Sequence, residues 1–342
     1  KAPGSNEYGR VDRVAGWFLL ARMYLNAQTW INENKYQEAY AYAVKVIADG
    51  HYPLASDYRE IFLADNNTCK EIIWPLVQDG LRAQSSAGTN FYVKAFVNGP
   101  MDELYKTGVG SRGWGNVRAK VSLVDAFDAD DVMFDGNDTW GNNKKDKRAQ
   151  FMTALPNQVK DTWDVNMDMT STFTCGYGYI KWRNVTKEDE LCPSGDAYTS
   201  IDFPLFRTAD AYLMAAEAIL RGANGTQSEA LGYVNEVRTR AYMSGKYAKN
   251  GVRSDVSGEI TANELNLDFL LVERQKELAS ELTRRTDLIR FGKYTKGNNW
   301  DWKNGVRLGA DVDDKYNLFP IPESELTNNP TLVQNDGYKV IK

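Results

Sequence analysis

The stretch that most constrains this chain is ERQKELASELTRRTDLIRFG, residues 273–292. Acids and bases recur in it at the spacing of one helical turn. Because residues four apart lie on the same face of an α-helix, a helix places Glu273, Glu277, Glu281 and Arg285 on one face. On a solvated surface such pairs contribute only ~0.3–0.5 kcal/mol each. The stretch therefore predicts a helix whose charged face has a structural role rather than a catalytic one.

The flanking sequence indicates where this helix begins and ends. Thr261 and Glu264 have the spacing of a capping box, in which each side chain satisfies a free backbone amide. Gly292 is a residue type that commonly ends helices. We therefore expect one helix from Thr261 to near Gly292. The segments LFPIPESEL (318–326) and NPTLVQNDGY (329–338) contain prolines that cannot continue a helix, and we expect both to be extended.

Apolar residues at steps of three and four predict two pairs of helices elsewhere in the chain. The first pair spans residues 11–28 and 36–48, and the second spans residues 207–221 and 228–242. Both pairs loosely follow the tetratricopeptide pattern, in which helix pairs stack on one another. Alanines in the second pair allow neighbouring helices to approach closely.

The helical signal fades between residues 54 and 206. Strand-like runs appear there, namely EIIWPLV (71–77), TNFYVKAFV (89–97) and YGYIKW (177–182), separated by clusters of Gly, Asn, Asp and Ser. Loops on a rigid helical frame are a common place for ligand contacts. We therefore expect a loop-rich region with short strands that faces a ligand.

The composition argues against several classes of protein. The net charge is −5 without a block of Lys or Arg, whereas a nucleic-acid binder needs a basic patch. No run approaches the ~20 apolar residues that span a bilayer. The chain opens on the polar turn KAPGSNEYG with no signal peptide, and we expect it to be part of a longer protein.

Histidine and cysteine are too sparse for most metal and catalytic sites. A single histidine, His51, argues against a Ser-His-Asp triad. Cys175 and Cys192 could form a disulfide, or these two and Cys69 are all free thiols. We expect no cofactor. The carboxylates of the polar loop 128–148 do not fit the spacing of an EF-hand, and a structural calcium ion there is the weaker alternative.

Several segments in order resemble the SusD/RagB family of surface glycan-binding lipoproteins from Bacteroidota-type bacteria. The matching segments are GRVDRVAGWFLLARMYLNA (9–27), EIIWPLVQDG (71–80), DFPLFRTADAYLMAAEA (202–218), NEVRTRA (235–241), ERQKEL (273–278), RTDLIRFG (285–292), FPIPESEL (319–326) and NPTLVQNDGY (329–338). The resemblance implies a mostly α fold of tetratricopeptide-like helical repeats, with a loop-rich irregular region and short strands. It also implies that the charged helix belongs to a partly buried ion network, with Arg207 and Glu217 as possible partners.

The resemblance predicts how the chain is organised. We expect a single SusD-like domain over residues 1–342, without the N-terminal part of the family. Within it, residues 9–50 and 205–292 are expected to form the helical-repeat scaffold and residues 54–204 the loop-rich, ligand-facing region. Residues 293–342 are expected to form an extended C-terminal segment.

The resemblance also implies a non-enzymatic function. Members of the family sit on the outer membrane at the cell surface, capture a glycan or another nutrient, and deliver it to a SusC-like TonB-dependent transporter. We expect membrane attachment only through an N-terminal lipid that lies upstream of this chain. Neither a nucleic-acid partner nor a cofactor is implied.

The segment VGSRGWGN (109–116) resembles the loop in which starch-binding members carry a stacking tryptophan. Trp114 falls at that position between two glycines, which let a ligand approach its ring face. Arg112 and Asn116 are placed to donate to sugar hydroxyls. A second aromatic residue expected near Ser85-Ser86 is absent, so the resemblance to the starch-binding members is incomplete at this position.

Other aromatic residues are weaker candidates for ligand contacts. Tyr92 and Phe91 are expected to share a strand, so that one points inward and the other outward. Trp140 lies beside a glycine in the polar loop. Packing is the favoured role for Trp300 and Trp302, although their segment also resembles the starch-binding members.

Two further functions compete with glycan binding. Tetratricopeptide-like repeats commonly bind protein segments in a groove, so a protein-interaction scaffold is an alternative. A glycoside hydrolase needs two carboxylates ~5–10 Å apart, one of them with a raised pKa. The acids of this sequence lie beside arginines or in polar loops, which disfavours that reading.

Overall fold

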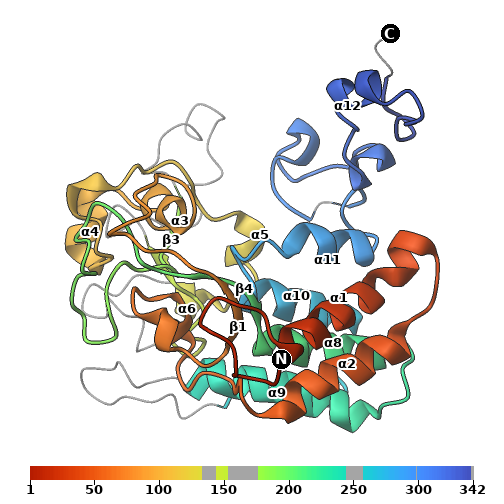
Figure 1. Cartoon of the computed structure of the whole chain (residues 1–342), viewed down its shortest axis with the longest axis horizontal. Helices are drawn as coiled ribbons and strands as arrows, with labels where there is room; N and C mark the ends of the chain where they lie inside the picture. Colours follow the sequence, from red (N-terminus) through yellow and green to blue (C-terminus); the bar gives the residue numbers. More distant parts are fainter. Residues whose placement is uncertain (133–143, 153–175, 244–256, 298, 340–342) are drawn as a thin grey trace.

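A computed structural model describes residues 1–132, 144–152, 176–243, 257–297 and 299–339. The chain is mostly helical, as expected. Four long helices lie side by side in the scaffold (Figure 1). They are α1 (Arg13–Ile31), α2 (Tyr36–Asp49), α8 (Thr208–Leu220) and α9 (Gln227–Met243), which confirm the helices expected at residues 11–28, 36–48, 207–221 and 228–242.

Local sequence explains how these helices begin and pack. Asp12 precedes α1, and its Oδ1 accepts hydrogen bonds from the backbone N–H groups of Val14 (2.8 Å) and Ala15 (3.2 Å), which satisfies two amides at the helix start. The scaffold core contains fully buried alanines of α8, including Ala211 and Ala215. Small side chains at these positions let α8 pack closely between its neighbours.

A short antiparallel sheet joins the scaffold to the loop-rich region. Strand β1 (Ile72–Leu76) pairs with β4 (Phe203–Arg207), with Ile72 opposite Arg207. The strand predicted at residues 71–77 is therefore confirmed. Because β4 runs directly into α8, Arg207 lies at the junction of the helical scaffold and the loop-rich region.

The helix expected from Thr261 to Gly292 is wrong as one continuous element. It is divided into α10 (Leu267–Glu277) and α11 (Arg284–Arg290). The capping contact between Thr261 and Glu264 forms, but α10 begins after Asn266, whose Oδ1 accepts from Phe269 N–H (2.9 Å).

The break between α10 and α11 has a physical cause. Ser280 and Leu282 adopt the left-handed conformation, with φ of 61° and 63°, which a continuing helix does not allow. In this turn Glu281 lies against two buried cations: its carboxylate accepts from Arg207 Nε (2.6 Å) and Lys181 Nζ (2.5 Å). These buried ion pairs fix the position of Glu281 between the two left-handed residues.

The charged face of residues 273–292 enters a buried ion network, which confirms the implied role of Arg207 and Glu217. In the first part, here called the Arg207 cluster, the guanidinium donates to Glu71 (2.9 Å), Glu277 (2.6 Å) and Glu281 (2.6 Å). The other buried cations of this cluster are Arg148, Lys181, Arg238 and Arg240.

The second part, here called the Glu217 cluster, joins α8 to α1, α10 and α11. Arg290 donates to Glu217 (2.7 Å), and Arg274 bridges Asp210 (2.8 Å) and Asp287 (2.9 Å). Arg22 of α1 and Arg221 complete it. Arg285 belongs to neither cluster.

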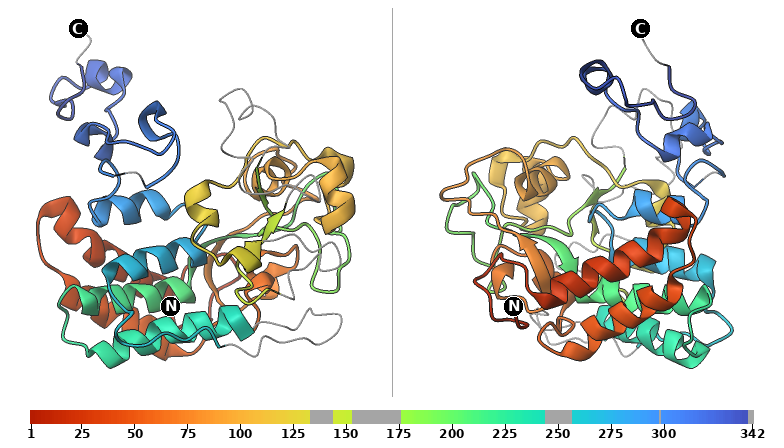
Figure 2. Two further views of the ribbon diagram at one scale, coloured as in Figure 1. Left: turned by 180° about the vertical axis from the view of Figure 1, so that it is seen from behind. Right: turned by 45° about the vertical axis from the view of Figure 1, so that its right-hand side comes forward.

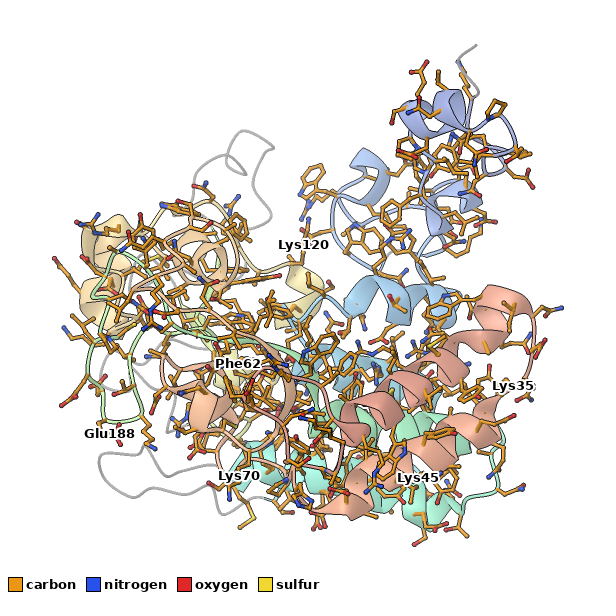
Figure 3. The ribbon with its side chains drawn as sticks, viewed as in Figure 1. Lys35, Lys45, Phe62, Lys70, Lys120 and Glu188 are labelled. Atoms are coloured by element: carbon orange, nitrogen blue, oxygen red, sulfur yellow. The ribbon has the colours of Figure 1, made fainter. Side chains whose placement is uncertain are left out.

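The loop-rich region holds short elements around an aromatic core. Trp182 is buried there, stacked on Phe203 at 5.6 Å and meeting Phe62 edge-on at 4.9 Å; Figure 3 labels Phe62 in this interior. The short elements are η1 (Tyr58–Phe62), η2 (Asn66–Thr68), α3 (Thr89–Ala95), α4 (Gly99–Tyr105), η3 (Gly110–Arg112), α5 (Val121–Val124), α6 (Ala129–Val132), β2 (Phe151–Met152) and β3 (Gly178–Tyr179).

Two of the predicted strands differ from the structure. Residues 89–97 are not a strand, because they form α3 and its C-terminal turn. Thr89, Asn90, Val93 and Lys94 are buried at helical spacing, and a short apolar run cannot be assigned to helix or strand from its pattern alone. The strand predicted at residues 177–182 is only the two-residue β3.

The C-terminal part projects from α11, and the two views in Figure 2 show it standing clear of the scaffold. Residues 323–328 were expected to be extended but form α12 (Glu323–Asn328). Pro322 at its N-cap and two glutamates in its first turn favour a helix start there. The remaining elements are η5 (Lys303–Gly305) and η6 (Asp314–Asn317). Within the described residues, no helix combines the length and apolar character that crossing a bilayer requires.

Candidate functional site

The loop that carries Trp114 is held on the C-terminal end of α3. The last carbonyl groups of a helix have no partners within the helix. Here the backbone N–H of Trp114 donates to Lys94 O (2.8 Å), and the N–H of Asn116 donates to Ala95 O (2.8 Å). The position of Trp114 is therefore set by backbone contacts.

Asp102 of α4 fixes the start of the same loop. Its carboxylate accepts from the backbone N–H groups of Val109 (3.1 Å) and Gly110 (3.0 Å), and from the hydroxyl of Thr107. The loop is thus anchored on both sides of Trp114, by α4 before it and by α3 beneath it.

Gly113 is required by close packing. A Cβ atom at this position would lie 2.4 Å from the carbonyl oxygen of Val97, so any larger residue would push the loop away from α3. Gly115 has a φ of +60°, which only glycine adopts without strain. The two glycines therefore fix the position of Trp114 and also leave its ring accessible to a ligand.

Trp114 and Phe91 form an exposed aromatic pair. The side chains are 37% and 43% exposed, with ring centroids 6.1 Å apart at an interplanar angle of 60°. Beside them is a pocket of about 360 Å³ that Trp114, Tyr198 and Ser86 line together with neighbouring loop residues. Large apolar rings exposed to solvent on anchored backbone suit stacking against the faces of sugar rings.

Polar groups surround this aromatic pair. Arg112 Nε donates to Asp196 Oδ1 (3.0 Å), and both side chains are exposed. Lys94 is buried, donates through Nζ to Ala197 O (2.5 Å), and has a pKa that burial and the nearby Arg112 lower from its ordinary value. Asn116 is exposed. These groups offer mainly hydrogen-bond donors, which hydroxyl oxygens can accept.

The structure places the candidate residues unequally. Arg112, Trp114 and Asn116 lie on one exposed loop, and Phe91 joins them from α3. Tyr92 is turned into the core, where it stacks on Trp182 at 5.4 Å. One ring of the pair therefore points outward and the other inward, although on a helix rather than a strand.

The other candidate tryptophans lie elsewhere. Trp140 lies outside the described residues. Trp300 packs against Tyr294, with ring centroids 5.6 Å apart, and the backbone of Trp302 pairs with Arg307 O (3.1 Å). Neither lines the pocket beside Trp114.

Sequence reasoning did not find Tyr198 or Lys94. Tyr198 follows a run of Gly, Asp and Ser, which marks a loop but does not say what the loop approaches. Lys94 lies in the segment whose sequence pattern predicts a strand but which forms α3. Ser86 lines the pocket at the place where a second aromatic residue was expected, and Tyr198 and Phe91 supply rings in its neighbourhood.

The structure offers little support for a metal site. Across the described ranges, no group of three or more His, Cys, Asp and Glu side chains is positioned to hold a metal ion. Most of the loop considered for calcium lies outside those ranges. Cys69 and Cys192 are free thiols, while Cys175, the other half of the considered disulfide, is not among the described residues.

Comparison with known proteins identifies relatives over most of the chain. The model of the SusD family matches residues 70–338. The chain is 33% identical to the starch-binding protein SusD of Bacteroides thetaiotaomicron, over 98% of this chain and 62% of the relative. It is 25% identical to the SusD-like protein P25 of Formosa agariphila, over 96% of this chain and 59% of that protein. The chain thus spans about six tenths of the length of these curated relatives.

Solved structures share the fold. A SusD-like protein from Bacteroides fragilis superimposes with a TM-score of 0.65 at 22% identity, covering 98% of this chain and 67% of the other. Surface glycan-binding protein A from Bacteroides thetaiotaomicron, solved in complex with laminarihexaose, gives a TM-score of 0.61 at 22% identity, covering 97% and 65%. On the extent of the family match and the identity to a curated member, the chain belongs to the SusD family.

Proposed function

We propose that this chain is the glycan-binding part of a non-enzymatic cell-surface protein that delivers its ligand to a SusC-like TonB-dependent transporter. The observation that carries the proposal is the exposed pair of Trp114 and Phe91 beside Arg112. An anchored aromatic surface with donors around it fits a saccharide better than a protein segment or a nucleic acid.

The proposed ligand is a polysaccharide or oligosaccharide, with starch or malto-oligosaccharides as the first candidates. Support comes from the relative named as a starch-binding protein. One stacked ring and a few hydrogen bonds correspond to weak binding, with a Kd of roughly micromolar to millimolar. Repeats along a polymer would raise the apparent affinity.

Within the proposed site, each residue has a role. The Trp114 ring stacks on a sugar face, Arg112 and Asn116 donate to hydroxyls, and Phe91 widens the aromatic surface. Tyr92 supports Phe91 from beneath, since their ring centroids lie 6.1 Å apart. A contribution from Trp140 remains a prediction.

The proposed role is binding without catalysis, and the chemistry of the pocket beside Trp114 agrees with it. None of the described residues that line the pocket beside Trp114 is a carboxylate, and the nearby Asp196 is paired with Arg112. Retaining and inverting glycosidases use two carboxylates ~5–10 Å apart. The relatives are named as binding proteins, which agrees with this proposal. Release of reducing sugar from a glycan by the purified protein would overturn it.

Family membership supports the proposed location and partner. A lipid on an N-terminal segment would anchor the longer protein to the outer membrane, with the loop-rich region of residues 54–204 facing the glycan. The helical scaffold of residues 9–50 and 205–292, followed by the C-terminal segment 293–342, completes the proposed single domain. The transporter is proposed to contact a surface other than the Trp114 loop.

Affinity electrophoresis through native gels that contain different polysaccharides tests the proposal. We expect one glycan, starch first, to retard the protein, and Trp114→Ala to abolish the retardation. Trp30→Ala is the matched control, because Trp30 is 56% exposed at the end of α1 and should not alter mobility. Equal retardation of the wild type and Trp114→Ala would refute this site.

A further inference from the structure

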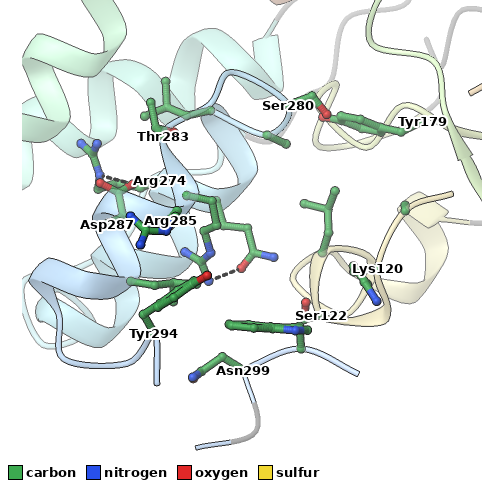
Figure 4. Close-up of a pocket in the computed structure, with 18 of the residues that line it drawn as sticks. Lys120, Ser122, Tyr179, Arg274, Ser280, Thr283, Arg285, Asp287, Tyr294 and Asn299 are labelled. Atoms are coloured by element: carbon green, nitrogen blue, oxygen red, sulfur yellow. Dashed lines mark hydrogen bonds and ion pairs between the residues drawn. The ribbon is translucent and has the colours of Figure 1, made fainter. Parts of the chain in front are cut away.

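A second pocket lies between α5 and the α10–α11 turn (Figure 4). It has a volume of about 410 Å³ and shares no lining residue with the pocket beside Trp114. Lys120 and Ser122 lie on one side, and Thr283, Arg285 and Tyr294 on the other (Figure 4). Its size falls in the range of small-molecule sites.

The walls of this pocket are rich in positive charge. Arg118, Lys120, Arg284 and Arg285 line it, and Asp287 is the one carboxylate among its described lining residues. That carboxylate is already engaged, because it accepts from the two buried arginines of the Glu217 cluster at 2.9 and 2.8 Å. Lys120 has a more distant partner, because its Nζ lies 3.8 Å from Asp301 Oδ2. The hydrogen bonds of Arg284 and Arg285 that the next paragraphs describe go to neutral groups.

Arg284 is a partly buried cation whose hydrogen bonds, among the described residues, go only to neutral groups. It donates to Leu271 O (2.8 Å) and to Gln275 Oε1 (2.7 Å), and no described carboxylate lies within ion-pair distance of it. Burial lowers the pKa of its guanidinium to about 10, with Asp287 opposing the change. A partly buried charge whose hydrogen bonds go only to neutral groups is incompletely compensated, so an anion bound here would be stabilised.

Arg285 supplies a second donor. One of its terminal nitrogens donates to the carbonyls of Tyr316 (2.9 Å) and Asn317 (3.1 Å). Its Nε is buried and has no hydrogen-bond partner among the described residues. A buried polar atom of this kind is uncommon, and a ligand oxygen would satisfy it.

The pocket also presents ring surfaces. Trp300 and Tyr294 meet at 5.6 Å with an interplanar angle of 39°, and the guanidinium of Arg285 lies 4.9 Å from the Tyr294 ring centroid. Both rings line the pocket together with Leu123. The wall thus combines cationic donors with flat apolar faces.

We propose that this pocket binds an acidic sugar, a pyranose that carries a carboxylate, independently of the Trp114 surface. The carboxylate is received by Arg284 and Arg285, since guanidinium groups make strong charge-assisted hydrogen bonds to it. The sugar ring rests against Trp300. Lys120 adds attraction from the opposite wall. This pocket gives the protein a preference for charged glycans that the neutral-sugar surface does not supply.

Isothermal titration with glucuronate, glucose and inorganic phosphate tests the proposal. We expect glucuronate to bind with a Kd in the millimolar range and glucose to bind at least about tenfold more weakly. Arg284→Gln and Trp300→Ala should each weaken glucuronate binding by about tenfold or more. Lys120→Gln, at an exposed position that should not affect folding, should give a smaller loss that disappears at high salt.

Controls separate this pocket from the proposed glycan surface. Trp114→Ala should bind glucuronate like the wild type. Arg82→Gln should do the same, because it removes a highly exposed cation that does not line this pocket. Circular dichroism establishes that each variant is folded.

Three results would overturn the proposal. The first is the absence of any heat of binding when glucuronate is titrated to a concentration of tens of millimolar, roughly the Kd of the weakest specific binding. The second is loss of glucuronate binding in Trp114→Ala. The third is phosphate binding as tight as glucuronate binding and unaffected by Trp300→Ala, because the pocket would then be a bare anion site. The first and third results leave neutral-glycan retardation at the Trp114 surface untouched. The second would place glucuronate at that surface without removing its neutral-glycan binding, so the two proposals fail separately.

Discussion

At the scale of single residues, the buried charged side chains impose the strictest requirement on this chain, because each needs partners of opposite charge. Arg207 is almost fully buried, yet three carboxylates surround its guanidinium at 2.6–2.9 Å. A buried ion that loses its partner is strongly destabilising. The side chains of the Arg207 cluster therefore constrain one another, and none can be changed without affecting the rest.

Gly113 allows a prediction about the glycan loop. Gly113→Ala should destabilise the protein by roughly 1–3 kcal/mol and weaken glycan binding, because the new Cβ would lie 2.4 Å from Val97 O and displace Trp114. Denaturant unfolding and affinity electrophoresis measure the two effects.

Gly16→Ala is the matched control for that substitution. Gly16 lies in α1, where a Cβ atom would meet nothing within 4 Å, so alanine should stabilise the helix by roughly 0.5–1 kcal/mol. Unchanged stability and binding in Gly113→Ala would show that the loop does not need its close approach to α3.

At the scale of elements, the turn between α10 and α11 contains a strained residue whose side chain is mostly in solvent. Leu282 has a φ of 63° and is 75% exposed. A non-glycine residue in this conformation costs about 1–2 kcal/mol. Leu282→Gly should therefore raise the free energy of unfolding by about 1 kcal/mol, measured by urea denaturation. A loss of stability would mean that the Leu282 side chain has contacts in solution that offset its strain.

Two buried carboxyl groups of helix α8 should make the free energy of unfolding decrease at acid pH. Burial opposes ionisation of Glu217 and Asp210, but neighbouring arginines outweigh it and lower the pKa of each carboxyl to about 2. Because these folded-state values lie below the unfolded ones, the stabilisation is complete above pH ~4.5. It is lost as the pH falls from there towards 2.

Thermal unfolding of Glu217→Gln across this pH range tests the assignment. The variant should be less stable than the wild type near neutral pH, and the difference should shrink as the pH falls from about 5 to 2. A difference that stays constant over that range would show that Glu217 does not titrate as the structure requires.

The elements also show what sequence can and cannot predict. The long helices are predictable because apolar residues that recur at steps of three and four over several turns fit a helix and not a strand, as in residues 11–28 and 207–221. The segment 89–97 was assigned wrongly, because seven to nine residues hold too few turns to separate the two periods. The break at residues 278–283 depends on Glu281 meeting Arg207 and Lys181, which are distant in sequence.

At the scale of the whole molecule, the Arg207 cluster connects the two regions. Glu277 of α10 accepts hydrogen bonds from Arg207 and Arg240, and from Arg148 of the loop-rich region at 3.1 Å. The scaffold and the loop-rich region therefore share one charged core in addition to the β1–β4 pairing. We expect them to unfold together.

Glu277→Gln tests this coupling. Removing one charge from the centre of the cluster should lower the free energy of unfolding by roughly 3–5 kcal/mol, in a single transition seen by both tryptophan fluorescence and far-UV circular dichroism. Glu264→Gln should change stability little, because the exposed side chain keeps an oxygen that can accept the capping hydrogen bonds from Thr261. Two separate transitions in the wild type would contradict a shared core.

The candidate site was partly predictable at this scale. Trp114, Arg112 and Asn116 are neighbours in one glycine-rich segment, so their common loop could be predicted from the sequence. The sequence identifies Phe91 and Tyr92 only as a pair, because which of the two rings points to solvent depends on how α3 packs. Tyr198 comes from a loop distant in the sequence and reaches the same pocket only through the tertiary fold.

The most direct test of the central claim is a calorimetric titration of Trp114→Ala and Trp30→Ala beside the wild type. The titrant is a soluble oligosaccharide of the glycan that retards the protein in gels. We predict that Trp114→Ala loses at least about tenfold in affinity, while Trp30→Ala and the wild type bind alike. Equal affinity in all three proteins, or no glycan that binds the folded wild type, would contradict the account.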